Sequence, residues 1–218
     1  MPLHIFGPGG PYTPMMECAH AFQETVGIEA VVTMGTPGQW IDRARESGDL
    51  IYGGAEYMMS DFVAAYPGIV DETTVTNLYT REVGIIVRKG NPAGISALTD
   101  LGRKGIRVLN VELEKMEALQ DKAAGIRENI SLSVLTGKEA FEAWPLETQI
   151  DAWITYRSWH VKLKDSSDFV RFPQDDRLFR ATPVAITVSS KSRGGAEAFI
   201  GFLKSDRARG IFQKWGWE

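Results

Sequence analysis

Three strand-like segments near the N-terminus each end in small residues that lead into a helical pattern. Residues 3–6, 28–33 and 49–52 are apolar enough to predict strands, and each of them leads into a loop with glycine, proline or alanine. This alternation of strands and helices predicts an α/β fold with an open sheet. In such a sheet the loops that follow the strands gather at one edge, where ligands bind. We therefore expect the functional residues of this chain in these loops.

The first of these loops is the barest. Residues 7–11 are only glycine and proline, so no side chain covers the backbone. Thr13 is predicted to cap the next helix, with Pro14 in its first turn and Gly27 as its stop. The apolar stripe of this helix is predicted to consist of Met15, Ala19, Phe22 and Val26. Free N–H groups and a positive helix end would suit an anion, although a glycine-rich turn without a ligand explains the same residues.

Two long apolar strands divide the rest of the chain. They are predicted near residues 83–87 and 183–188, and α/β alternation lies on both sides of them. Helices are predicted at 95–101, 114–124 and 138–144. We expect two lobes, residues 1–82 with 185–218 and residues 83–184, joined by a hinge of two crossover strands. A cleft between such lobes is a common ligand site.

Composition and motifs exclude several classes of function. The chain is 44% hydrophobic and 24% charged with a net charge of −4, so it is typical of a soluble globular protein and not of a nucleic-acid-binding one. The dinucleotide glycine fingerprint, the P-loop, zinc spacing and serine nucleophile signatures are all missing. We therefore expect no cofactor, no metal and no catalytic residue. The one cysteine, Cys18, is expected to be a buried, inert thiol.

Several segments together resemble the class II periplasmic solute-binding proteins, in particular the branch of the accessory colonization factor C proteins, related to the molybdate and sulfate binders. The segments that carry the resemblance are 49–59, 78–81, 87–92, 150–154 and 199–217. The resemblance implies a type 2 periplasmic-binding-protein-like fold, in which each lobe is a mixed sheet flanked by helices. It also implies a small anionic ligand, such as an oxyanion or a phosphorylated or carboxylated metabolite.

The resemblance also assigns site residues. Molybdate-binding relatives carry serines in the first two loops and a tyrosine in the second lobe. Here the first loop offers backbone N–H groups of Gly9 and Gly10 together with Tyr12 or Thr13, and Thr36 stands in the second loop. Tyr156 fits the tyrosine position. These departures argue against bare molybdate or sulfate and leave room for a bulkier organic anion.

Charged residues near the two crossovers complete the predicted site. Arg81 is expected to hold a carboxylate or phosphate, with a surface arginine paired with Glu82 as the alternative. Gly54 and Glu56 follow the third strand; Glu56 is predicted either to contact ligand hydroxyls or Arg81, or simply to be a charge at a helix start. In the second lobe we expect Lys115 and Arg157 near the ligand, although two polar turns would explain Arg157 and its neighbour Trp159 equally well.

Two acidic residues, Glu112 and Glu114, fall in the same second-lobe loop as Lys115. Two carboxylates would repel an anion, so either they point away or the ligand carries a cation or hydroxyls.

The sequence thus predicts a non-enzymatic solute-binding protein, a monomer or homodimer, with an ABC transporter as its possible membrane partner. An enzyme with Glu56 as general base, or a sensor domain on the same scaffold, are the alternatives. Met1–Pro2 leads directly into a strand, so we expect a periplasmic or extracellular location only if a signal peptide has been removed.

Overall fold

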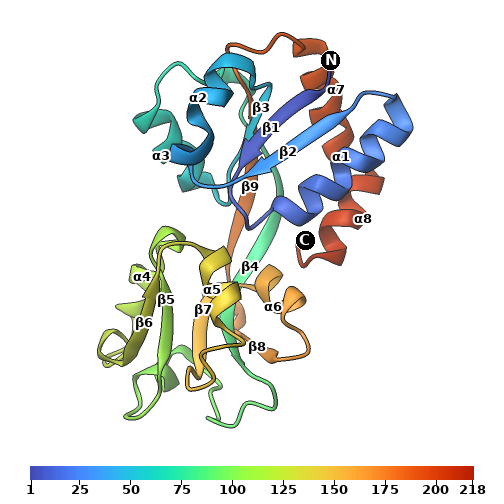
Figure 1. Ribbon diagram of the computed structural model, residues 1–218. Coiled ribbons are helices and arrows are strands. Elements are labelled where there is room, and N and C mark those ends of the chain that lie inside the picture. Colours follow the sequence, from blue (N-terminus) through green and yellow to red (C-terminus); the bar gives the residue numbers. More distant parts are fainter. The chain divides into compact units, whose positions relative to one another are not determined.

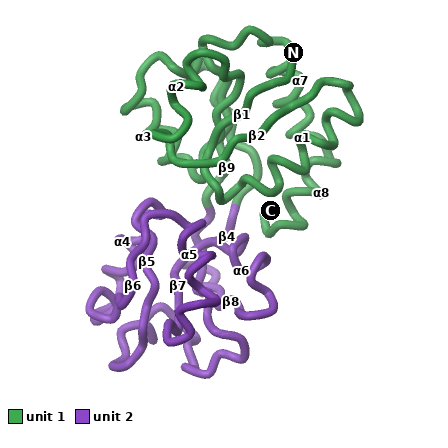
Figure 2. The backbone as a smooth tube through the Cα atoms, viewed as in Figure 1, with its two compact units in different colours: residues 1–80, 180–218 green, residues 81–179 purple.

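The computed structural model describes residues 1–218 as two compact units (Figure 2). Unit 1 contains residues 1–80 and 180–218, and unit 2 contains residues 81–179. The chain passes between them along two strands, β4 (Thr76–Arg88) and β9 (Leu178–Ile186). The boundaries expected from the sequence, at 82 and 185, lie within these two strands and stay a prediction.

Helices and strands alternate through both units (Figure 1). The remaining strands are β1 (Leu3–Gly7), β2 (Ala30–Met34), β3 (Leu50–Tyr52), β5 (Val108–Val111), β6 (Ile130–Val134), β7 (Ala152–Tyr156) and β8 (Ser167–Arg171). The α-helices are α1 (Tyr12–Val26), α2 (Pro37–Ser47), α3 (Glu56–Ala65), α4 (Glu117–Gln120), α5 (Gly137–Ala143), α6 (Arg157–Lys162), α7 (Arg193–Leu203) and α8 (Asp206–Lys214). Short 3₁₀ helices are η1 (Glu72–Thr74), η2 (Leu98–Gly102), η3 (Glu112–Glu114), η4 (Arg127–Asn129) and η5 (Gln174–Asp176).

The sheet of unit 1 has the strand order β2-β1-β3-β9. β1 runs parallel to β2 and β3, and β9 is antiparallel to β3. Both faces are covered, because successive residues of β3 point into different cores. Leu50 and Tyr52 belong to the core formed with α1, α7 and α8, whereas Ile51 belongs to the core formed with α2 and α3.

Helix α1 differs from its prediction at its start and in one residue of its apolar stripe, Val26. Its N-cap is Pro11, and Thr13 lies inside the first turn, so the prediction of Thr13 as N-cap was wrong. Gly27 ends the helix as expected, in the left-handed conformation with φ of 78°, and its N–H donates to the carbonyl oxygen of Gln23 at 2.8 Å. Val26 is 46% exposed, because the last turn of α1 extends past the packed core. Cys18, on the same helix, is fully buried, and burial raises the pKa of its thiol to about 12.

The sheet of unit 2 has the strand order β4-β7-β5-β6, and β8 also pairs with β4. β5, β6 and β7 are parallel, whereas β4 is antiparallel to β7 and β8. Trp144 and Trp153 are fully buried in its core. Arg88 closes one side of this core, with its guanidinium 3.9 Å from the centre of the Trp144 ring. The same guanidinium donates to the carbonyl oxygens of Trp144, Glu147 and Ile150 at 2.5–2.8 Å.

The predicted helix over 114–124 was wrong in its extent. Only Glu117–Gln120 is α-helical, because Lys115 has a left-handed backbone with φ of 49° that separates η3 from α4. Met116 and Leu119 are buried as their spacing indicated. The apolar pattern therefore identified the buried side of this segment but not its backbone conformation.

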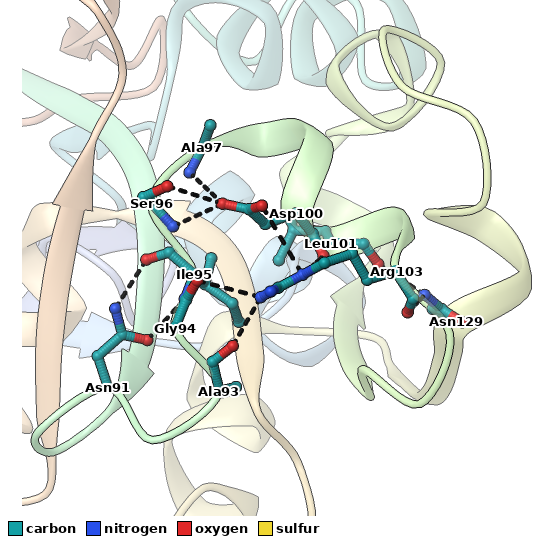
Figure 3. Close-up of polar contacts among 10 residues, drawn as sticks. All are labelled: Asn91, Ala93, Gly94, Ile95, Ser96, Ala97, Asp100, Leu101, Arg103 and Asn129. Carbon is teal, nitrogen blue, oxygen red and sulfur yellow. Dashed lines mark hydrogen bonds and ion pairs between the residues drawn. The ribbon is translucent and has the colours of Figure 1, made fainter.

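The α-helix predicted over 95–101 does not form, and hydrogen bonds from polar side chains hold this segment instead (Figure 3). The Asp100 carboxylate accepts from the backbone N–H groups of Ser96 and Ala97 at 2.8 and 2.9 Å, and only η2 forms. Asn91 fixes the preceding turn, since its side-chain amide both donates to the carbonyl oxygen of Ile95 and accepts from the Ile95 N–H. Aspartate and asparagine side chains that bond nearby backbone groups compete with helix formation in this way.

None of the helices has the length and apolar character needed to cross a membrane.

Candidate functional site

In unit 1 the predicted site residues lie at one edge of the sheet. The parallel register aligns Gly7 with Met34 and Phe6 with Ile51, so β1, β2 and β3 end side by side. The predicted residues follow these strand ends: Gly9, Gly10, Tyr12 and Thr13 after β1, Thr36 after β2, and Gly54 and Glu56 after β3. The expectation that these loops gather at one edge is confirmed. The edge also carries the N-terminus of the 15-residue helix α1.

Thr36 and Glu56 both have structural contacts at helix starts. Thr36 is the N-cap of α2, and its N–H donates to the Oε1 atom of Gln39 at 2.8 Å. Glu56 is the first residue of α3, and its Oε1 atom accepts from the backbone N–H of Ala181 at 2.7 Å. The second carboxylate oxygen of Glu56 is buried without a hydrogen-bond partner. A charge at a helix start is therefore part of its role, and contact with a ligand stays a prediction.

In unit 2 the strand register brings a second group of predicted residues to one edge. β5 and β7 are parallel, so the residues after Val111 and after Tyr156 lie at the same end. β4 runs the opposite way and pairs Val83 with Tyr156, which places Arg81 at that end as well. The edge thus holds Arg81, Glu114, Lys115, Tyr156 and Arg157.

Arg81 is a buried residue with contacts to β7 and α6. The residue is only 2% exposed, and its guanidinium carbon lies 3.8 Å from the centre of the Tyr156 ring. Its Nη1 atom donates to the hydroxyl of Ser158 at 3.4 Å. Glu82 instead forms ion pairs with Arg171, at 3.1 Å, and with Arg177, at 3.8 Å. The alternative of a surface arginine paired with Glu82 was therefore wrong.

Glu114 is a buried carboxylate close to Arg81. It is 8% exposed; its Oε2 atom accepts from the Thr155 hydroxyl at 2.6 Å and its Oε1 atom from the indole N–H of Trp159 at 2.9 Å. Burial raises the pKa of Glu114 to about 7, although these two hydrogen bonds and the charge of Arg81 act in the opposite direction. The neighbouring Glu112 is exposed. The two acidic residues of this loop thus have opposite environments, which the sequence did not distinguish.

Helix α6 brings two positively charged residues, Arg157 and Lys162, to the same edge as Glu114. The ammonium nitrogen of Lys162 lies 4.7 Å from the centre of the Trp159 ring, and burial together with the charge of Arg81 lowers the pKa of Lys162 to about 8. Arg157 is the first residue of α6, so the interpretation of this segment as two polar turns was wrong. Lys115 is exposed beside Glu114.

Sequence reasoning missed four residues that lie around Arg81 and Glu114: Thr155, Ser158, Lys162 and Gly137. Thr155 and Ser158 are buried polar residues on either side of the predicted Tyr156. Gly137 is close enough that a Cβ atom on it would lie 2.7 Å from the Trp159 ring and 2.8 Å from the Oε1 atom of Glu114. Polar residues directly after an apolar strand were the available signal. No three His, Cys, Asp or Glu side chains are grouped so that they could hold a metal ion.

Comparisons with solved structures place this geometry among periplasmic binding proteins. PEB3 with bound L-phospholactate is 26% identical, with 99% of each chain covered and a TM-score of 0.84; the structure of Peb3 from Campylobacter jejuni gives 0.83 at the same identity. The sulfate-binding protein SubI of Mycobacterium tuberculosis is 22% identical, covering 100% of this chain and 86% of SubI, with a TM-score of 0.82. The substrate-binding domain of a putative molybdenum ABC transporter of Clostridium difficile is 18% identical, covering 99% and 97% of the chains, with a TM-score of 0.69.

The type 2 periplasmic-binding-protein-like fold expected from the sequence is thereby confirmed. A search of curated protein sequences finds no match. The family described as bacterial extracellular solute-binding protein matches residues 3–218, nearly the whole chain. The chain therefore belongs to the bacterial extracellular solute-binding proteins.

Proposed function

We propose that this protein binds a small organic anion that carries phosphoryl and carboxylate groups, of the chemical class of L-phospholactate. The support is its 26% identity to phospholactate-bound PEB3 across 99% of both chains, within a solute-binding family. The neighbours named for sulfate and molybdenum are less similar, and they support the fold alone.

The observation that carries this proposal is the buried guanidinium of Arg81. The protein has a net charge of −4, so its overall field does not attract an anion, and a local positive charge must do so. A guanidinium can donate two parallel hydrogen bonds to one carboxylate or phosphoryl group. Stacking on the Tyr156 ring at 3.8 Å fixes the plane of the guanidinium, so little side-chain freedom remains to be lost when an anion binds. Because this guanidinium is buried, water competes less with the anion for its hydrogen bonds.

The remaining predicted residues are proposed as anion contacts within each unit. In unit 1, the start of α1 is suited to an anion because it is the positive end of the helix dipole. Glu56 would instead accept from a ligand hydroxyl. The proposed contacts are Gly9, Gly10, Tyr12, Thr13, Thr36, Gly54 and Glu56 in unit 1 and Arg81, Lys115, Tyr156 and Arg157 in unit 2.

The proposed role is capture and transport, with release of the anion unaltered. The family is one of extracellular solute-binding proteins, and one structural neighbour is named as part of an ABC transporter. We accordingly propose an extracellular or periplasmic location and delivery to a membrane transporter. The absence of a recognisable nucleophile signature in the sequence agrees with binding without chemistry.

Calorimetric titration with L-phospholactate, phosphoglycerate, sulfate and molybdate tests the proposal. We expect the two organic phosphates to bind and Arg81→Ala to weaken that binding at least about tenfold, since a charge-assisted hydrogen bond contributes about 1.5–3 kcal/mol. Arg81→Lys should recover only part of the affinity, because an ammonium cannot form the two-pronged contact.

Two controls separate binding from folding. Arg81→Met keeps the aliphatic stem over Tyr156 without the charge, and it should bind as poorly as Arg81→Ala while unfolding at a higher denaturant concentration. Arg45→Ala removes an arginine that is half exposed on α2 and should bind like the wild type. Undiminished affinity in folded Arg81→Met would refute the role of Arg81, and failure of both organic phosphates to bind would refute the ligand class.

A further inference from the structure

The Glu114 carboxyl interacts with the charge of Arg81 at the edge of unit 2 where β5 and β7 end. The proposed function does not explain this carboxyl group. A permanent negative charge beside an anion-binding arginine would oppose the binding of any anion. We propose that Glu114 binds a proton when an anion binds at Arg81, so that the affinity of this protein for its ligand falls as the pH rises. This inference rests on the proposed function and adds to it the protonation of one residue.

The hydrogen bonds of Glu114 are compatible with both charge states. Trp159 can only donate through its indole N–H, and it bonds to the Oε1 atom at 2.9 Å in either state. Thr155 has a hydroxyl, which can donate or accept, and it lies 2.6 Å from the Oε2 atom. An ionised Glu114 accepts from this hydroxyl, whereas a protonated Glu114 can donate to it. The proton can therefore be gained or lost without leaving a buried oxygen unpaired.

The packing around Glu114 keeps this carboxyl group in place. Gly137, the first residue of α5, leaves room for it, since a Cβ atom there would lie 2.8 Å from the Oε1 atom. Glu114 is thus enclosed by η3, β7, α5 and α6 rather than extended into solvent. A rotation into water, which would keep the charge solvated at any pH, requires breaking the bonds to both Thr155 and Trp159.

The charge of Arg81 acts on Glu114 and lowers its pKa, against the effect of burial. The charged or titratable residues on the segments packed against Glu114 fall into two groups. The exposed ones are Glu112, Lys115, Glu117, Lys138, Glu139 and Glu142, and the partly buried ones are Arg157, His160 and Lys162. Without a ligand, burial of the Glu114 carboxyl raises its pKa to about 7. An anion at Arg81 would add a negative charge nearby and draw on the same guanidinium, and both effects raise this pKa further.

The size of the effect follows from the fraction of protein in the protonated form. With a pKa of about 7, this fraction falls about tenfold between pH 6 and pH 8. If the anion binds only that form, its affinity falls by the same factor. Lys162, whose pKa is about 8, would add a further loss of affinity at higher pH, so the test must separate the two residues.

The test is titration of L-phospholactate into the wild type, Glu114→Gln and Lys162→Met at pH 6, 7 and 8. Glutamine keeps the hydrogen-bond acceptor and cannot ionise. Because the phosphate of the ligand also titrates, the measured quantity is the ratio of the affinities of the wild type and Glu114→Gln at each pH. We expect the wild type to lose about tenfold relative to Glu114→Gln between pH 6 and pH 8. Lys162→Met should bind more weakly but retain most of this pH dependence.

Repeating the titration at pH 7.5 in buffers of different ionisation enthalpy reports proton uptake directly. The wild type should take up more protons per ligand than Glu114→Gln. Binding by both proteins with the same pH dependence and the same proton uptake would overturn this inference and leave the proposed function standing. Failure of both to bind at any pH would overturn the proposed function and this inference with it.

Discussion

Replacing Glu114 with glutamine should stabilise the folded protein in alkaline solution without any ligand. Burial raises the folded-state pKa of this carboxyl to about 7, whereas its ordinary value is 4.5. Between these two values the folded state binds more protons than the unfolded state, so the stability of the wild type must fall as the pH rises through that range. The difference corresponds to about 3 kcal/mol, reached fully above pH 8.

Urea denaturation followed by tryptophan fluorescence at pH 5, 6, 7 and 8 measures this effect. The quantity to compare is the free energy of unfolding of Glu114→Gln minus that of the wild type, in which the titration of all other groups cancels. We expect this difference to grow by about 2–3 kcal/mol from pH 5 to pH 8, because part of the full effect already develops below pH 5. Glu112→Gln is the matched control, because Glu112 lies in the same loop, two residues away, but is exposed. A constant difference for Glu114→Gln, or the same change in both variants, would contradict the reasoning from the burial of Glu114.

Three further predictions concern packing and function. Arg88→Met should destabilise the protein by about 2–4 kcal/mol in urea denaturation, because it removes the donor for three carbonyl oxygens, whereas Arg45→Met on the surface should change stability by less than about 0.5 kcal/mol. Gly137→Ala should lower the free energy of unfolding by about 1–3 kcal/mol in the same assay, because its Cβ atom would overlap the Trp159 ring. Gly201→Ala, in α7 with open space around it, should be neutral or stabilising. Mass spectrometry after long incubation should recover L-phospholactate unchanged, and any product would favour the enzyme alternative.

The parts of the fold that depend on local pattern could be predicted from the sequence. Strand β1, the bare loop after it and helix α1 with its stop at Gly27 follow from apolar spacing and glycine placement. The gathering of the loops after β1, β2 and β3 at one edge follows from the parallel alternation. The start of α1 was missed by two residues, because Pro11 takes the cap position that Thr13 was expected to fill.

Two kinds of feature could not be predicted from apolar spacing: local bonds or backbone turns that interrupt a helix, and contacts between residues far apart in the sequence. The N–H groups of Ser96 and Ala97 bond to Asp100 where a helix was predicted over 95–101, and the left-handed backbone of Lys115 interrupts the helix predicted over 114–124. The apolar spacing of both segments is nevertheless helical. The contacts of the candidate site are of the second kind. Arg81 and Glu114 were both noticed, but their burial and their shared neighbours on β7 and α6 arise from strand pairing over more than 40 residues.

The enclosed thiol of Cys18 makes this protein convenient for fluorescent labelling. A maleimide dye needs an accessible thiolate, and Cys18 offers neither access nor ionisation near neutral pH, since its pKa is about 12. Cysteines introduced at exposed helix positions, Asp42 in unit 1 and Glu142 in unit 2, would therefore take up donor and acceptor dyes with the native thiol left in place. Energy transfer between the two dyes would then report how the distance between the units responds to each candidate anion.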